Sequence, residues 1–536
     1  MARFYIENFG CRATQADGAA LERQFLERGL ERAGTARDAE IVVLNTCTVT
    51  EGADKDARAS IRRLQRINPH CRILVTGCYA QRAPEELAAM PGVTWVVGNS
   101  HKHRAAEIAT TQDSLARRSS DGFIPLAELS RVATGLPHIA NAMSGVNQWE
   151  LLGNIVVGDI FAHTQLMAAP VFEAANERTR PNLKVQDGCD NRCSFCVIPY
   201  VRGQSRSLPA ERVIAEVRTL VEAGYREVVI SGINLGRWGR DLGNSSQFSV
   251  VSSQSVVGRG SVAVGGAGPQ HLKSNRERRT TNEQRLVDLI RAILDDTSLE
   301  KLRISSVEPM DWSDELIDLV ASSSRIAKHA HVPMQSGSDA VLRRMHRKYR
   351  PWHYREKIRK IREAMPRAAI GADVMVGFPG ESAAEFDETR RMIEELPFTY
   401  LHVFTYSARP GTPAAEQPGQ VPVTVARERN AVLRQIGSAK KQAFLRSLVG
   451  TEVEAITLQA GGPDFTEALT ENYLKVRVAG RFEANRWMRL CVERVEGEML
   501  VARRSGDHGR EEAAVVTREC TKENRHIDLQ PIARVR

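Results

Sequence analysis

Short apolar runs alternate with amphipathic segments over the first 110 residues of the chain. The apolar runs predict strands at Arg3–Asn8, Glu40–Asn45, Arg72–Thr76 and Val93–Val97. Apolar residues at helical spacing predict helices at Gly18–Arg28 and Arg58–Ile67. Short apolar strands separated by helices favour an α/β fold with a parallel sheet.

A second alternating region runs from about residue 180 to about residue 415. Six strands are predicted there, at Leu183–Gln186, Glu227–Ser231, Lys301–Ser305, His329–Pro333, Ala369–Met375 and Tyr400–Tyr406. Helices are predicted after most of them, at Pro209–Ala223, Glu283–Leu294, Asp314–Ser323, Ala340–Met345, Tyr354–Ala364 and Ala383–Glu395. Six such units predict a partial TIM-like (β/α)6 barrel, whose active site would lie at the C-terminal ends of the strands.

A β-rich region follows the predicted barrel. Strands are predicted at Thr451–Leu458, Leu474–Val478, Met488–Glu493 and Met499–Ala502, which suits a small β-barrel. The chain is therefore divided into an α/β domain (1–110), a linker or insertion (111–175), a barrel (176–425), a connecting helix (426–449), a β-barrel (450–505) and a tail (506–536). A Ser- and Gly-rich stretch, 243–282, is expected to be a mobile insertion in the larger barrel.

Composition adds an expectation about compartment and partner. The chain has 536 residues, and no apolar run is long enough to cross a bilayer. Its N-terminus lacks the pattern of an export leader, so we expect a cytoplasmic protein with no membrane partner. The 74 Lys and Arg exceed the 65 Asp and Glu, and the formal net charge of +9 suits a polyanionic partner such as RNA.

Three of the nine cysteines form a CxxxCxxC triad, Cys189, Cys193 and Cys196, directly after a predicted strand. A zinc site would normally require a fourth Cys or His nearby, and the nearest histidines in sequence are His163 and His271. Three cysteines can instead hold a 4Fe-4S cluster with one iron open to an external ligand. The amino and carboxylate groups of S-adenosylmethionine (SAM) can chelate that iron. The triad thus predicts a radical SAM enzyme, with a three-cysteine zinc site or buried thiols as the alternative.

Cys11, Cys47 and Cys78 each come directly after a predicted strand of the first domain. In a parallel sheet these strand ends share one edge, where ligands of α/β proteins bind. The three thiols are therefore candidates for a second cluster, or are ordinary buried residues. Cys71 precedes its strand, and Cys491 and Cys520 have no cysteine neighbours, so they are excluded.

Polar residues and turns follow several predicted barrel strands on the expected catalytic face. The residues expected to contact SAM are Ser231, Gly232, Ser305, Glu308, Gln335, Ser336 and Val374.

Taken together, these motifs resemble the methylthiotransferases, which are two-cluster radical SAM enzymes. The motifs are NFGCR (8–12), NTC (45–47), TGC (76–78), LKVQDGCDNRCSFCVIPYVRG (183–203), RISSVEP (303–309), QSGSD (335–339), VGFPGE (376–381) and HVFTYSARPGTPAA (402–415). The resemblance implies an N-terminal domain with an auxiliary 4Fe-4S cluster on Cys11, Cys47 and Cys78. It also implies a radical SAM barrel with a cluster on Cys189, Cys193 and Cys196, and a C-terminal TRAM β-barrel that grips RNA.

The family's reaction attaches a methylthio group to an unactivated C–H carbon. One SAM methylates a sulfur on the auxiliary cluster, and a second yields the 5′-deoxyadenosyl radical. The motifs NFGCRATQ, SSVEP and SARPGTPAA are most similar to enzymes that act on N6-threonylcarbamoyladenosine at position 37 of the tRNA anticodon stem-loop. Alternatives are isopentenyladenosine in tRNA, an aspartate of a ribosomal protein, and a non-catalytic iron–sulfur protein that binds RNA. The family also implies a flavodoxin- or ferredoxin-like electron donor.

The chain departs from the family pattern in two ways. Ala13-Thr14 replaces the usual pair, whose second residue is Asn, and the chain carries two long insertions. The first change is expected to affect cluster packing, and the insertion at 243–282 to affect substrate access.

Overall fold

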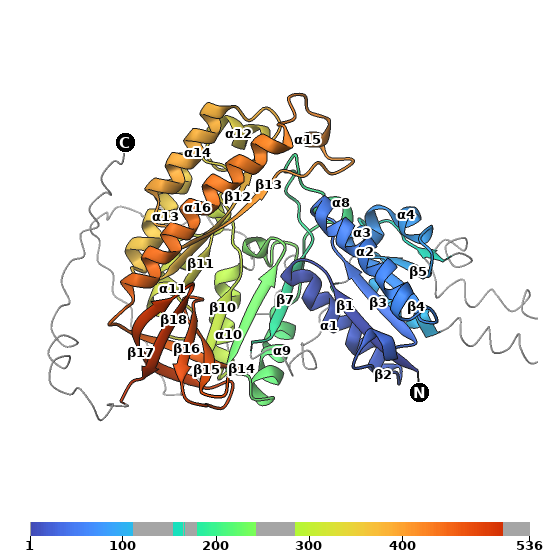
Figure 1. Ribbon diagram of the computed structural model, residues 1–536, viewed down its shortest axis with the longest axis horizontal. Coiled ribbons are helices and arrows are strands. Elements are labelled where there is room, and N and C mark those ends of the chain that lie inside the picture. Colours follow the sequence, from blue (N-terminus) through green and yellow to red (C-terminus); the bar gives the residue numbers. More distant parts are fainter. Residues whose placement is uncertain (1, 111–153, 164–165, 167–179, 243–284, 507–536) are drawn as a thin grey trace, which may run out of the picture.

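The computed structural model describes residues 2–110, 154–163, 166, 180–242 and 285–506 (Figure 1). The predicted insertion 243–282 lies outside the described residues, as do most of the predicted linker and tail. Among the described residues, no helix combines the length and apolarity required to span a bilayer.

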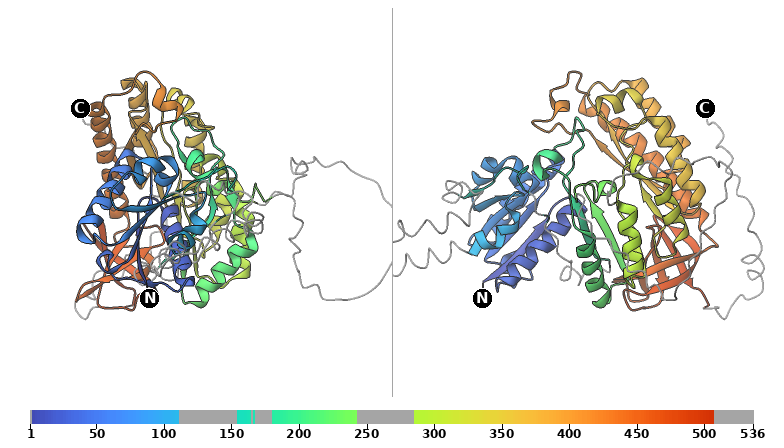
Figure 2. Two further views of the ribbon diagram at one scale, coloured as in Figure 1. Left: turned by 90° about the vertical axis from the view of Figure 1, so that its right-hand side faces the viewer. Right: turned by 180° about the vertical axis from the view of Figure 1, so that it is seen from behind.

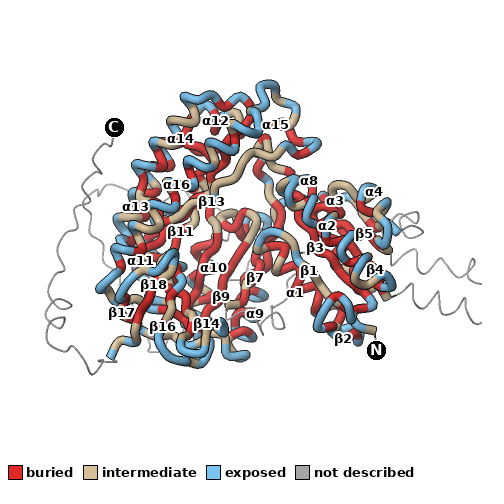
Figure 3. The backbone as a smooth tube through the Cα atoms, viewed as in Figure 1, coloured by how far each residue is buried: buried red, intermediate tan, exposed pale blue. Residues whose placement is uncertain are grey.

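The N-terminal domain is a parallel sheet with strand order β2-β1-β3-β4-β5-β6. Its strands are β1 (Arg3–Asn8), β2 (Glu31–Arg32), β3 (Ile41–Thr46), β4 (Arg72–Gly77), β5 (Val93–Gly98) and β6 (Ile155–Val156). The four predicted strands are confirmed, since central strands are continuous apolar runs buried on both faces (Figure 3). The edge strand β6 comes from the segment predicted to be linker.

Two predicted helices of this domain begin too late. Its helices are α1 (Arg12–Glu27), α2 (Glu51–Ile67), α3 (Cys78–Arg82) and α4 (Pro84–Ala88), with 3-10 turns η1 (Ala36–Asp38) and η2 (Lys102–Arg104). The first turns of α1 pack through small residues such as Ala13 and Ala16, which give little apolar periodicity. In α2 the helix is started by its N-cap, because Thr50 Oγ1 accepts a hydrogen bond from Ala53 N at 3.2 Å.

The central domain contains the six predicted parallel strands, arranged in two sheets of order β10-β9-β7-β8 and β11-β12-β13. Its strands are β7 (Asn182–Asp187), β8 (Arg206–Ser207), β9 (Glu227–Gly232), β10 (Lys301–Ile304), β11 (His329–His331), β12 (Ala369–Val376) and β13 (Tyr400–Thr405). One main-chain bond, from Val307 N to His331 O at 3.1 Å, helps to link the sheets beyond β10. The partial barrel is thus open, as predicted, and interrupted between β10 and β11.

Helices cover the outer face of these sheets (Figures 1 and 2). The helices of the central domain are α8 (Ile198–Arg202), α9 (Ala210–Glu222), α10 (Leu286–Asp296), α11 (Asp314–Ser322), α12 (Asp339–Arg344), α13 (Pro351–Ala364), α14 (Ala383–Glu395), α15 (Pro413–Glu416) and α16 (Val423–Ser447), with turns η4 (Leu235–Arg237) and η5 (Pro309–Asp311). Of these, α8 packs against α3 of the N-terminal domain instead of covering the sheets. Helix α16, predicted only as a connector, also packs along β13.

The C-terminal domain is a closed five-stranded barrel of order β14-β15-β16-β18-β17. Its strands are β14 (Glu452–Gly461), β15 (Phe465–Thr470), β16 (Lys475–Ala479), β17 (Trp487–Glu496) and β18 (Met499–Arg504). Strand β15 was not predicted, although its alternation places Thr466, Ala468 and Thr470 inside. The closed barrel agrees with the TRAM architecture and sits beneath the N-terminal ends of the central strands (Figure 1).

Candidate active site

Cys11, Cys47 and Cys78 come together at one edge of the N-terminal sheet. Cys11 is the N-cap of α1, Cys47 follows β3, and Cys78 begins α3 directly after β4. Burial, followed by the neighbouring Cys78 and Cys11, raises the pKa of Cys47 to about 12. Cys71, by contrast, lies at the other end of β4 within the core.

Gly77 allows β3 and β4 to end side by side with a cysteine after each. It is the register partner of Thr46 and has φ +104°, a conformation that L side chains rarely adopt. A Cβ at this position would lie 2.3 Å from Thr46 O. The spacing between Cys47 and Cys78 therefore depends on glycine at position 77.

Cys189, Cys193 and Cys196 occupy the loop between β7 and α8, at the C-terminal end of β7. Burial, followed by Cys193 and Cys189, raises the pKa of Cys196 to about 12. Arg347 Nη1 donates to Cys193 Sγ at 3.2 Å, while Arg347 Nη2 donates to Glu308 Oε1 at 2.9 Å. A buried cation thus sits beside this triad.

The two cysteine triads meet in one apolar cluster. Cys78 is buried together with Val197, Ile198 and Val201 of the α8 region, and the partly buried Cys189, Cys196 and Ile233 pack against them. The sequence predicted each triad separately, and the fold brings Cys78 of the first triad and Cys189 and Cys196 of the second into this shared cluster.

The donor sets fit iron–sulfur clusters better than single ions. Among the described residues, no three His, Cys, Asp or Glu side chains converge closely enough to hold one metal ion. A 4Fe-4S cluster is larger than one ion and takes three thiolates at separate corners. Several buried polar atoms on elements around the second triad have no hydrogen-bond partner within the described structure. A polar ligand bound beside the cluster would satisfy such atoms. They are Ser231 Oγ, Asn234 Oδ1, Ser305 Oγ, Gln335 Oε1 and Arg347 Nε.

The residues expected to contact SAM occupy different environments. Gln335, at φ +61°, forms an isolated bridge with Val374, whose side chain belongs to the apolar core. Ser336 Oγ is engaged with Thr389 Oγ1 of α14 at 3.1 Å. Gly232, at the end of β9, lies so close to Gln186 that a Cβ would come within 2.8 Å of its Oε1.

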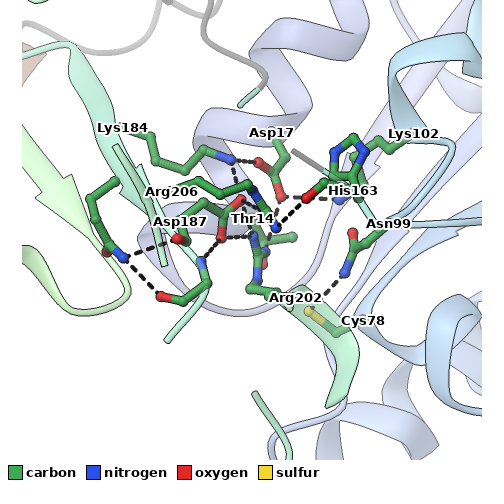
Figure 4. Close-up of polar contacts among 12 residues, drawn as sticks. Thr14, Asp17, Cys78, Asn99, Lys102, His163, Lys184, Asp187, Arg202 and Arg206 are labelled. Carbon is green, nitrogen blue, oxygen red and sulfur yellow. Dashed lines mark hydrogen bonds and ion pairs between the residues drawn. The ribbon is translucent and has the colours of Figure 1, made fainter. Parts of the chain in front are cut away.

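Sequence reasoning missed a buried ion network at the junction of the two α/β domains (Figure 4). Asp17 of α1 accepts hydrogen bonds from Lys102 Nζ at 3.0 Å, from Arg202 Nη2 at 2.9 Å and from Lys184 Nζ. Asp187 at the end of β7 accepts from Lys184 Nζ at 2.8 Å and from Arg202 Nη1 at 2.9 Å. All five side chains are at most 10% exposed.

A row of rings on the inner face of β11-β12-β13 was also missed. Ile370, Ala372 and Val374 face the helices, so the alternate residues on all three strands face inward. The rings are Tyr473, His329, Tyr400, His331 and His402, in that order, with successive centroids 5.4 to 6.0 Å apart. Tyr473 comes from the C-terminal barrel, and Arg12, Arg180 and Arg303 lie over its ring within 5.6 Å. The motif strings HAH (329–331) and YLH (400–402) carry four of these rings and could have signalled the row.

Two family profiles match the chain. Residues 3–98 match "Uncharacterized protein family UPF0004", and residues 183–238 and 257–393 match the radical SAM superfamily. The first match covers the sheet that carries Cys11, Cys47 and Cys78. The second begins at β7 and includes Cys189, Cys193 and Cys196.

Named relatives extend over nearly the whole chain. A threonylcarbamoyladenosine tRNA methylthiotransferase of Bacillus subtilis is 34% identical over 90% of this chain and 91% of its own length. The corresponding enzyme of Aquifex aeolicus is 31% identical over 91% of this chain and 99% of its own length. A tRNA-2-methylthio-N(6)-dimethylallyladenosine synthase of Bacillus subtilis is 28% identical over 90% of this chain and 81% of its own length.

These matches agree with the paired cysteine triads, the open barrel and the C-terminal β-barrel. The cofactors of such enzymes are SAM and 4Fe-4S clusters, which the donor sets fit. The chain therefore belongs to the radical SAM methylthiotransferase family.

Proposed function

We propose that the protein adds a methylthio group to C2 of N6-threonylcarbamoyladenosine at position 37 of tRNA. The observation that carries the proposal is the meeting of two cysteine triads across one apolar cluster. A reaction that needs both a radical source and a sulfur donor requires two such centres to reach one substrate.

Each triad has a distinct role in this proposal. Cys189, Cys193 and Cys196 hold the cluster that binds SAM, and Cys11, Cys47 and Cys78 hold the auxiliary cluster. When bound, these groups supply the radical and the sulfur needed to replace an unactivated C–H bond. The residues of the chain hold the thiolates, exclude water through the Val197, Ile198 and Val201 packing, and orient the substrate.

The ring row supports an RNA substrate. Unpaired bases are recognised by stacking on aromatic and histidine rings, with cations at the phosphates. His402 is exposed and Tyr400 partly exposed on the inner face of the open barrel, while Arg12 and Arg180 flank the row at the Tyr473 end. A base extruded from the anticodon loop would have a stacking surface leading toward the cysteines.

Support for threonylcarbamoyladenosine as the modified base comes from the relatives. The two relatives of 31% and 34% identity are named for that nucleoside. The Bacillus subtilis synthase named for dimethylallyladenosine, at 28% identity, makes isopentenyladenosine the second candidate.

The test is mass spectrometry of nucleosides from tRNA of a bacterial host stripped of its own methylthiotransferases. We expect 2-methylthio-N6-threonylcarbamoyladenosine with the intact chain and with Cys491→Ala. We expect none when the Cys189, Cys193, Cys196 triad or the Cys11, Cys47, Cys78 triad is changed to Ala.

Other products would redirect the assignment. A methylthiolated isopentenyladenosine would identify the second candidate. Unmodified tRNA together with a methylthiolated ribosomal-protein aspartate would refute the proposal for tRNA. Activity that survives loss of the Cys11, Cys47, Cys78 triad would refute the auxiliary cluster.

A further inference from the structure

We propose that the buried ion network of Asp17, Lys102, Lys184, Asp187 and Arg202 is the electrostatic counterpart of the auxiliary cluster, so that its surplus cation stabilises the anionic cluster and raises its reduction potential. This inference rests on the proposed ligation of that cluster by Cys11, Cys47 and Cys78.

The network contains more buried cations than carboxylates. The cations are Lys102, Lys184 and Arg202, which are 2–3% exposed. In the described part of the chain, only Asp17 and Asp187 form ion pairs with them. Arg206 lines the same cavity, at 4.0 Å from Asp187, but it also interacts with a third carboxylate, Asp241, so including this pair leaves the surplus unchanged. One positive charge of the three central cations therefore has no carboxylate among the described residues, and an uncompensated buried charge is strongly unfavourable.

The pKa directions agree with this imbalance. Burial would raise the pKa of Asp17, but Lys102, Lys184 and Arg202 together hold it below its ordinary value. For Lys102, burial outweighs the attraction of Asp17, so its pKa is lowered. A lysine in this situation stays charged more readily when another anion is near.

The candidate for the missing anion is Cys78, once it ligates the auxiliary cluster. Asn99 Nδ2 donates to Cys78 Sγ at 3.5 Å and to Val201 O, the residue before Arg202, at 2.7 Å (Figure 4). Asn99, Lys102 and Arg202 line the same small cavity, which also touches Asp17, Lys184 and Asp187. The network and the cysteine edge are thus neighbouring parts of one polar junction.

Cluster binding would supply the missing negative charge. Thiols that ligate a metal lose their protons, and net charge is one of the quantities that set cluster potentials. A fixed buried cation favours the reduced cluster, which carries one more electron, because the low-dielectric surroundings screen little. Lys102 and Arg202 are therefore positioning residues that act through the cluster's charge.

The experiment separates charge from structure by using the Asp17–Lys102 pair. The parent is the full chain with Cys189, Cys193 and Cys196 changed to Ala, so that the measured signal comes from the auxiliary cluster alone. Its midpoint potential is measured by electron paramagnetic resonance during redox titration, and its stability by the rate at which a chelator removes iron. The variants are Lys102→Gln, Lys102→Arg, Asp17→Asn, and Asp17→Asn with Lys102→Gln.

The charge account predicts opposite shifts from the two single neutralisations. Lys102→Gln should lower the potential and release iron about 10- to 100-fold faster, the usual range for loss of a residue supporting a ligand. Asp17→Asn should raise the potential. Lys102→Arg and the double variant, which restores the net charge, should stay near the parent in potential.

A purely structural role gives a different pattern. Shifts in the same direction for Lys102→Gln and Asp17→Asn, or equal potentials throughout, would overturn the inference while leaving the cluster assignment intact. If folded Lys102→Gln holds no cluster, as judged by circular dichroism and iron content, the double variant must recover it. Failure to recover also overturns the inference, whereas a parent that holds no cluster refutes the auxiliary assignment itself.

Discussion

Replacing Gly77 by Ala should separate the cysteines of the auxiliary triad without touching any of them. The added Cβ would lie 2.3 Å from Thr46 O and 2.6 Å from Thr46 N, in a sheet where backbone on both sides is buried. Holding Ala at φ +104° costs on the order of 1–3 kcal/mol. Relieving the contact by moving backbone adds about 1–3 kcal/mol.

Gly224→Ala is the matched control. Gly224 has φ +92°, but a Cβ there would meet nothing within 4 Å. The two variants therefore share a positive φ, and Gly77→Ala adds the contact with Thr46, about 1–3 kcal/mol. This difference is a substantial part of the roughly 5–15 kcal/mol that stabilises a typical domain.

The measurement combines denaturant unfolding with iron content in the chain that lacks Cys189, Cys193 and Cys196. Gly224→Ala should retain the auxiliary cluster, and Gly77→Ala should be less stable and lose most of the iron. Equal unfolding free energies and equal iron in the two variants would refute the account of the β3–β4 edge.

Three further outcomes are expected. Arg347→Met should weaken retention of the cluster at Cys193 by about 10- to 100-fold in a chelator assay, because a cationic donor to the thiolate is lost. Arg347→Lys should be intermediate, and unchanged retention in Arg347→Met would contradict this. Tyr473→Phe should lower the free energy of unfolding by about 0.5–1.5 kcal/mol, because it keeps the ring but loses the hydrogen bond that Arg12 Nη2 donates to Tyr473 OH at 3.0 Å. A melting temperature equal to the parent's would argue against a stabilising role for that hydrogen bond. Burial, and to a smaller extent the charge of Arg206, lowers the pKa of His163 to about 4. His163 should therefore stabilise the fold fully above pH 6.5 and lose that contribution as pH falls toward 4. Melting temperatures of the parent and His163→Leu across that window should converge at low pH, and parallel curves would show that His163 does not contribute.

The local sequence pattern predicted the elements that are apolar over their whole length. The strands Ile41–Thr46 and Arg72–Gly77 are apolar throughout and buried, so their type and strand-end cysteines could be inferred from sequence. The start of α1 was predicted six residues late because its first turn faces a neighbouring domain through small side chains, which periodicity does not detect. The open barrel is divided into two sheets because, in the described part of the chain, no ladder of hydrogen bonds joins β10 to β11, and no local pattern predicts such a break.

The site shows the same division between local and tertiary information. The cysteine spacing indicated both triads, but their meeting depends on how α8 docks against α3. Nothing in the sequence marks Asp17 and Lys102 as buried, since charged side chains are rarely buried without partners. The cations that contact Asp17 are Lys102, Lys184 and Arg202, which lie 85, 167 and 185 residues from it in the chain, so only the folded structure identifies them.

The contact between Arg12 and Tyr473 has a consequence for how the protein is made. These residues are 461 positions apart, and the first lies next to Cys11. A ribosome adds about 5–20 residues each second, so roughly 20–90 s separate the synthesis of the two partners. Throughout that interval the N-terminal sheet can form from contacts within its own segment, while its cysteine edge still lacks the last piece of chain that packs beside it. We therefore expect that iron and sulfide can reach the proposed cluster ligands at this edge during translation, before the C-terminal barrel is made.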